Sequence, residues 1–168
     1  LAAEHPESVA KIAEGCAEGW LSIVGGDLDE SPVPFQHLNS ILWQVEESQR
    51  VLRETFGVES RVWGRRRYGF IAQWPQLLKK AGFTGALHVA LDDGFYPDEE
   101  HSKFRWQGID HSSIEALSRI PLAADSATSF LRFAARMSES MDRDHTAGGI
   151  FARWPDLRTP YFDDLRRM

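Results

Sequence analysis

The sequence has little of what redox chemistry, membrane insertion or nucleic-acid binding would need. Its single cysteine, Cys16, excludes an internal disulfide, and its place on the apolar side of an expected helix favours a buried, inert thiol. No stretch approaches about eighteen consecutive apolar residues, and the first residues lack the basic and apolar regions of a signal peptide. No membrane span or export signal is therefore visible, and the compartment stays open. The net charge of -6 disfavours phosphate backbones and anionic membranes as partners.

The composition is that of a soluble domain with a core of its own. The chain has 168 residues, 42% of them hydrophobic and 26% charged, which suits one domain. We find no linker, low-complexity run or internal repeat. Because the chain begins at Leu1 rather than at a methionine, we expect residues 1–168 to be a single domain that is a fragment of a longer protein.

Helices and strands are expected to alternate along the chain. Apolar residues at three- and four-residue spacing, with proline near the start and glycine after the end, predict helices. Short apolar runs between them predict strands. The predicted helices are 5–19, 36–56, 74–81 and two that begin at 126 and 159, and the predicted strands are 20–26, 60–64, 85–91, 103–109, 113–120 and 148–154. This order is typical of a mostly parallel α/β sheet, open or closed into a barrel.

Proteins of this class bind ligands in the loops at the carboxyl ends of their parallel strands. Four loops of the predicted pattern qualify, and a fifth segment is a turn between two strands. They are residues 25–31, 65–70, 92–101 and 154–160, with 107–113 as the turn.

Four segments of the sequence carry a family resemblance when they are taken together. They are Gly25 and Gly26 followed by Glu30, then "ETFGV", "YGFIAQWPQLLKKAG" and "WQGID". In order and spacing they resemble the catalytic domain of family 38 glycoside hydrolases, the α-mannosidases. The resemblance implies part of a seven-stranded β/α barrel of the glycoside hydrolase/deacetylase type. It also implies zinc-assisted hydrolysis of α-mannosides with retention, through a covalent glycosyl intermediate.

The resemblance places an arginine where the family has its nucleophile. Tyr68 and Gly69 take the Phe-Gly places of the family's Asp-x-Phe-Gly segment, so the aspartate position falls on Arg66. A retaining glycosidase needs a carboxylate there, about 5 Å from its acid, and a guanidinium can neither attack carbon nor bind a cation. The family's other zinc ligands match nothing in the chain. We therefore expect no catalytic residue and no complete zinc site in this chain; an unusual branch with its carboxylates elsewhere is the alternative.

Five residues form the predicted carbohydrate-binding set. Arg66 offers a fork of hydrogen-bond donors, and Glu30 matches a family glutamate, although an acid at a helix start or on the surface explains Glu30 equally well. Asp110 also matches a family residue, but a turn aspartate that bonds its own backbone is the commoner case. Tyr68 and Trp154 lie at the ends of predicted strands and could stack on a sugar ring.

Several polar residues near these loops are expected to have ordinary structural roles. Adjacent residues of an extended chain point to opposite sides, so at most two of Arg65, Arg66 and Arg67 can face one pocket, and paired surface charges are the favoured interpretation. Asp27 and Asp29 are expected to be solvated. Most tryptophans are expected in the core.

The residue types for a metal site are present without a spacing that would assemble one. They are His88, Asp92, Asp93, His101 and His111. No pair of them is fixed on one helix face or tight loop, so a metal is not predicted, and His88 is expected to be a hydrogen-bonded core histidine. A polysaccharide deacetylase would need such a metal set, which weighs against that relation.

Two functional hypotheses follow from the sequence. The first is a family 38-like domain that acts on or binds carbohydrate and is catalytically degenerate. The second is a non-catalytic structural or protein-interaction module that kept only the fold. In either case the open sheet edges of a partial barrel could pair protomers into a homo-oligomer.

Overall fold

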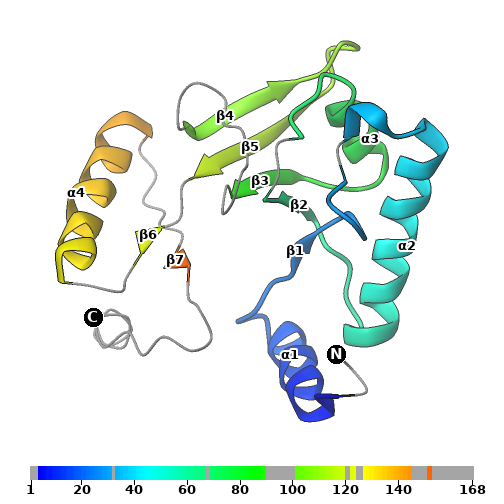
Figure 1. Cartoon of the computed structure of the whole chain (residues 1–168), viewed down its shortest axis with the longest axis horizontal. Helices are drawn as coiled ribbons and strands as arrows, with labels where there is room; N and C mark the ends of the chain where they lie inside the picture. The colour runs from blue at the N-terminus through cyan, green and yellow to red at the C-terminus, as the bar shows by residue number, and fades with distance from the viewer. Residues whose placement is uncertain are drawn as a thin grey trace.

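The computed structural model describes residues 4–31, 33–66, 69–89, 101–119, 122–123, 127–144 and 151–152 (Figure 1). Helices and strands alternate along the first half of the chain, as predicted. The elements are α1 (Pro6–Glu18), β1 (Val24–Gly25), the 3₁₀ turn η1 (Val33–Phe35), α2 (Leu38–Phe56), β2 (Val62–Arg65), α3 (Trp74–Lys80), β3 (Gly85–Val89), β4 (His101–Gln107), β5 (Ser113–Arg119), β6 (Leu122–Ala123), α4 (Ala127–Asp144) and β7 (Phe151–Ala152).

The four predicted helices that fall on described residues are confirmed. Helix α1 begins at Pro6 and ends before Gly19, and α2 ends before Gly57. Both glycines adopt the left-handed conformation that closes a helix. The last predicted helix, from residue 159, lies outside the described residues.

The main sheet has five strands in the order β1-β2-β3-β5-β4. Strands β1, β2, β3 and β5 are parallel, whereas β4 is antiparallel to β5. Only the short turn 108–112 separates β4 from β5, and so short a connection requires an antiparallel pair. The mostly parallel α/β sheet is consistent with part of a barrel, while closure into seven strands stays a prediction. Strands β6 and β7 form a separate parallel pair.

Some strands are shorter than the sequence predicts. The apolar run 20–26 pairs with β2 only at Val24 and Gly25, so β1 has two residues. Of the predicted strand 148–154, the structure describes β7 alone. A short apolar run shows where a strand can form, but only the hydrogen bonds to a neighbouring strand decide how much of it pairs.

One face of the main sheet is buried and carries the core. Trp63, Ala86 and Ala116 lie in register across β2, β3 and β5 on this face. Trp63 packs against Trp74 of α3 at 5.2 Å between ring centroids and against Trp106 of β4 at 5.7 Å. Trp63, Trp74 and Trp106 are thus core residues, as expected, whereas Trp20 and Trp43 are 67% and 57% exposed. The core cluster comprises Val33, Ile41, Val45, Trp63, Trp74, Leu78, Phe83, Ala86, Trp106, Ile114 and Ala116.

Two further predictions concern α1 and the membrane. Cys16 is only partly buried, so the prediction of a buried thiol was too strong; α1 lies at the periphery beside α2 (Figure 1), where a helix has fewer neighbours to cover it. None of the helices in the described part of the chain combines the length and the apolar content that crossing a lipid bilayer requires.

Candidate functional site

A row of buried polar residues crosses the sheet near the carboxyl ends of its parallel strands. Arg65 ends β2, His88 lies opposite it in β3, and Ser118 lies opposite His88 in β5. All three are buried, and His88 Nδ1 lies 3.2 Å from Ser118 Oγ. Phe70 packs edge-on to the His88 ring, which confirms the predicted core histidine. This end of the sheet is where the sequence predicts the ligand site.

Arg65 forms a buried ion pair with Asp27 from the loop after β1. Arg65 Nη1 donates to Asp27 Oδ2 at 2.7 Å, and the two side chains are only 1% and 5% exposed. Arg65 Nη2 also donates to the backbone oxygen of Ser31 at 2.5 Å, and Trp63 Nε1 donates to Asp27 Oδ1 at 3.2 Å. Both carboxylate oxygens and two arms of the guanidinium therefore have partners, which offsets the cost of burying the charges.

Two glycines allow the loops to close over this pair. Gly26 has φ 147°, and a Cβ there would lie 2.6 Å from Trp63 Cδ1. At Gly69, in the loop after β2, a Cβ would lie 2.6 Å from Arg65 Cδ. The backbone can approach Trp63 and Arg65 this closely only because both positions lack a side chain.

Burial is the largest influence on the protonation of two groups in this region. It raises the pKa of Asp27, while the hydrogen bond from Trp63 and the charge of Arg65 act in the opposite direction. Burial lowers the pKa of His88, and the charge of Arg65 adds to this effect. Arg65 thus favours a charged Asp27 and a neutral His88.

A second, more exposed ion pair lies beside the buried one. Arg66 Nε lies 3.3 Å from Glu30 Oε1, and the backbone nitrogen of Arg66 donates to the same oxygen at 3.2 Å. The Arg66 side chain is 60% exposed and that of Glu30 is 21% exposed. The pair therefore presents both donors and an acceptor to solvent at the carboxyl edge.

The structure brings together two of the five predicted site residues and separates a third. Glu30 and Arg66 are in contact, whereas Asp110 lies in the β4–β5 turn before β5, at the amino end of the parallel strands. Asp110 accepts hydrogen bonds from the backbone nitrogen and hydroxyl of Ser112, the turn role that the sequence also suggested. Tyr68 and Trp154 lie outside the described residues, as does Arg67.

The prediction that Asp27 is solvated was wrong, and Arg65 was not singled out. Asp27 is buried because the loop after β1 folds back over the end of β2, which places its carboxylate against Arg65. The alternation of side chains along β2 could have indicated that Arg65 is buried. Arg65 follows the buried Trp63 by two residues and therefore faces the same side of the sheet. Asp29 is exposed, as expected.

The described residues do not assemble a metal site. In the part of the chain that the structure describes, no three His, Cys, Asp or Glu side chains gather as ligands. Asp27, the carboxylate nearest the β2 end, directs both oxygens at N–H donors, which does not suit zinc. His88 lies near the carboxyl edge and His111 in the opposite turn, while Asp92 and Asp93 fall outside the described residues. The expected lack of zinc stays a prediction.

Comparisons with known proteins give a relative by sequence and two solved structures with a similar fold. The curated α-mannosidase of Saccharomyces cerevisiae (strain ATCC 204508 / S288c) is 28% identical over 116 residues, which cover 68% of this chain and 11% of that protein. Among solved structures, 4-alpha-glucanotransferase from Thermococcus litoralis superposes with a TM-score of 0.61 at 14% identity, covering 95% of this chain and 26% of that one. An alpha-mannosidase from Enterococcus faecalis V583 gives 0.58 at 14% identity, covering 89% and 18%.

These coverages mean that the chain spans only a small part of each relative's length. At 14% identity, the two solved structures show a shared fold. The sequence model of the "Glycosyl hydrolases family 38 N-terminal domain" matches residues 1–146, which is most of the chain. The fold, the yeast relative and this match together show that the chain belongs to the family 38 glycosyl hydrolases, as part of their N-terminal domain.

Proposed function

We propose that this domain binds carbohydrate at the carboxyl edge of its sheet without hydrolysing it. The observation that carries the proposal is that, within the described residues, arginines hold two carboxylates of the loop after β1 at this edge. Arg65 binds Asp27, and Arg66, at the position of the family's nucleophile, binds Glu30.

The loss of hydrolysis follows from the chemistry of the two pairs. A covalent glycosyl intermediate requires a carboxylate oxygen that can reach the anomeric carbon. Asp27 is 5% exposed and accepts hydrogen bonds at both oxygens, so a sugar cannot approach it. Glu30 Oε1 accepts from the backbone and the side chain of Arg66, which lowers its nucleophilicity. Arg66 itself cannot act as a nucleophile.

Carbohydrate binding is supported by what Arg66 and Glu30 present to solvent. A guanidinium donates in a planar fork and a carboxylate accepts, so together they match the vicinal hydroxyls of a sugar. The pair lies where α/β folds bind ligands, and the yeast and Enterococcus relatives are named α-mannosidases. We therefore favour an α-mannoside as the sugar.

Titration of the protein with methyl α-mannoside and mannose oligosaccharides, followed by tryptophan emission, tests the binding. Trp63 contacts Asp27 directly, so a ligand at this edge should change the emission. We expect a saturable change that Arg66→Ala weakens at least about tenfold, the effect of losing a charge-assisted hydrogen bond.

Arg66→Ala should not disturb the fold, because an exposed ion pair contributes only about 0–1 kcal/mol. Arg105→Ala, which removes an exposed arginine paired with Glu115 elsewhere on the sheet, is the matched control and should leave the titration unchanged. A titration that shows no saturable change with any mannoside would remove the binding proposal.

The second candidate is a non-catalytic structural or protein-interaction module. The two ion pairs favour it in one respect, because they connect the loop after β1 to the end of β2 and so could serve the fold alone. The same titration separates the two candidates, since the structural module predicts no response to sugars.

A further inference from the structure

The loop that carries Glu30 is tied to the end of β2 on both sides of this residue. Arg65 Nη1 donates to Asp27 Oδ2 at 2.7 Å, and Arg65 Nη2 donates to the backbone oxygen of Ser31 at 2.5 Å. Asp27 lies shortly before Glu30 in the sequence, and Ser31 follows it directly. One guanidinium therefore holds the loop before and after Glu30.

The Arg65 side chain is itself held in place. It is 1% exposed, and its stem passes so close to the backbone after β2 that a Cβ at Gly69 would lie 2.6 Å from Arg65 Cδ. A planar guanidinium on a fixed stem directs its donors along set directions. Because Arg65 is buried, it can influence a ligand in solvent only through the loop that it holds.

The charges of the loop give this hold a purpose. Burial raises the pKa of Asp27 most, the charge of Arg65 lowers it, and the charge of Glu30 raises it further. The carboxylates of Asp27 and Glu30 therefore repel each other, while Arg65 attracts Asp27. Without the guanidinium, the loop would relieve the repulsion by moving Glu30 into water, away from the backbone nitrogen of Arg66 that donates to it.

We propose that Arg65 is the positioning residue of the Arg66–Glu30 site. It does not contact the ligand, but it places Glu30 against the backbone nitrogen and the side chain of Arg66. The inference deepens the carbohydrate-binding function proposed above and rests on that function for its ligand. The buried arginine sets the place of the acceptor, and its exposed neighbour supplies the donors.

Nuclear magnetic resonance of the 168-residue chain follows the contact between Glu30 and Arg66 without any ligand. The backbone amide of Arg66 donates to Glu30 Oε1 at 3.2 Å, so Glu30→Gln should shift the Arg66 amide resonance. We define this shift as the Glu30 response. It is measured in the wild type and again in each Arg65 variant, as in a double-mutant cycle.

Two Arg65 variants change the hold on the loop. The Glu30 response should fall below about half in Arg65→Lys, because an ammonium held by Asp27 cannot also reach Ser31 as the fork does. Arg65→Lys keeps a positive charge beside Asp27, so the fold is retained, which urea denaturation checks. The response should also fall in Arg65→Met/Asp27→Asn, which removes both ties and leaves no buried charge unpaired. An Arg65 that served stability alone would leave the response of a folded variant unchanged.

The mannoside titration described above is the second readout. Arg65→Lys should weaken the binding of mannose oligosaccharides about threefold or more, since the acceptor is no longer held beside Arg66.

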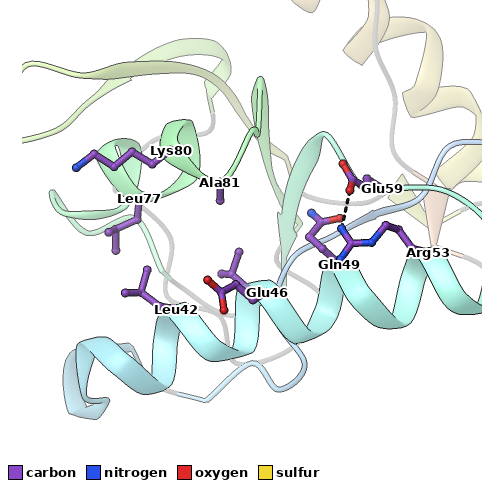
Figure 2. Close-up of a pocket in the computed structure, with 9 residues that line it drawn as sticks. Leu42, Glu46, Gln49, Arg53, Glu59, Leu77, Lys80 and Ala81 are labelled. Carbon is purple, nitrogen blue, oxygen red and sulfur yellow. Dashed lines mark hydrogen bonds and ion pairs between the residues drawn. The ribbon is translucent and has the colours of Figure 1, made fainter.

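Arg53→Lys is the matched control. Arg53 Nη1 pairs with Glu59 Oε1 at 2.5 Å, just before β2 and at the opposite end of this strand from Arg65 (Figure 2). The control makes the same substitution in another arginine–carboxylate pair. It should leave both the Glu30 response and the titration unchanged.

Two results would overturn the inference. The first is a Glu30 response that both Arg65 variants retain, which would show that Arg65 serves the fold alone. The second is a lost response in Arg65→Lys with undiminished mannoside binding. A wild type that binds no mannoside would contradict the proposed function instead, and the Glu30 response would still decide whether Arg65 places Glu30.

Discussion

Two neighbouring arginines differ in exposure because successive side chains of a strand point to opposite faces. Arg65 faces the same side as Trp63 and is buried, whereas Arg66 begins the loop and is exposed. The buried pair with Asp27 therefore bears on stability, and the exposed pair with Glu30 is available to a ligand. Arg65 is therefore held in the fold, while Arg66 is the neighbour for which we propose ligand binding.

Replacing Arg65 should destabilise the protein more than replacing any exposed arginine. Arg65→Met leaves Asp27 buried without its counter-charge, and we expect the free energy of unfolding to fall by about 3–5 kcal/mol. Urea denaturation measures this. The double variant Arg65→Met/Asp27→Asn should recover part of the loss, because no uncompensated charge stays buried. A loss below about 1 kcal/mol in the single variant would show that the pair is not buried as described.

The side to which Arg65 points could be predicted from the sequence, but its partner could not. The alternation from Trp63 determines the face, and this is a local property. Asp27 lies 38 positions away, and no local pattern couples the two residues. The contact arises from parallel pairing of β1 with β2, which brings the ends of both strands together. The carboxyl-edge location of Glu30 and Arg66 was predictable for the same reason, as a consequence of the fold class.

The turn between β4 and β5 shows how local bonds shape an element. Ser112 donates to Asp110 through both its backbone and its hydroxyl, while His111 adopts φ 64°, in the left-handed region. The backbone nitrogen of Ile109 donates to the oxygen of Ala72, which connects the turn to the loop before α3. The hairpin is thus fixed at its tip as well as along its strands.

Stability should depend on the ionisation of Asp110. The hydrogen bond from Ser112 lowers the pKa of Asp110, so the folded state favours the carboxylate. The resulting stabilisation is fully present above the ordinary value of 3.8 and is lost as the pH falls through the lowered pKa. Asp110→Asn should unfold at lower urea concentration than the wild type at neutral pH, with a difference that shrinks in acid.

His111 should tolerate only residues that accept the left-handed conformation. His111→Val should lower the free energy of unfolding by about 1–2 kcal/mol, because a β-branched side chain is strained at this φ. His111→Asn should be close to neutral, since asparagine adopts the conformation readily. Thermal denaturation followed by circular dichroism compares the two variants, and equal melting temperatures would contradict the assigned turn.

Helix limits were easier to predict than strand limits for a physical reason. A proline can start a helix and a glycine can end one through its own backbone, as Pro6 does at the start and Gly19 and Gly57 do at the ends here. A strand exists only where a neighbour supplies hydrogen bonds, so the apolar run 20–26 yields a β1 of two residues. The antiparallel place of β4 likewise depends on pairing with β5 and follows from the short turn between them.

At the scale of the whole molecule, the two edges of the main sheet differ. The β4 edge carries exposed Lys103 and Arg105, both near Glu115, and its pairing with β5 has an irregularity between His101 and Phe104. Charges and irregular pairing at an edge oppose the addition of another strand. Edge-to-edge pairing of protomers, as the sequence suggested, stays a prediction, and the two-residue β1 is the edge without these obstacles.

The central claim is that the domain does not hydrolyse glycosides, because Arg65 and Arg66 hold the carboxylates of Asp27 and Glu30 at the carboxyl edge. The most direct test is the release of p-nitrophenol from p-nitrophenyl α-mannoside by the full-length gene product, with zinc supplied. We predict no release above the buffer rate, and the same result for Glu30→Gln and Asp27→Asn. Release that a chelator abolishes and that Glu30→Gln or Asp27→Asn removes would contradict the account, since one of the two held carboxylates would then be catalytic.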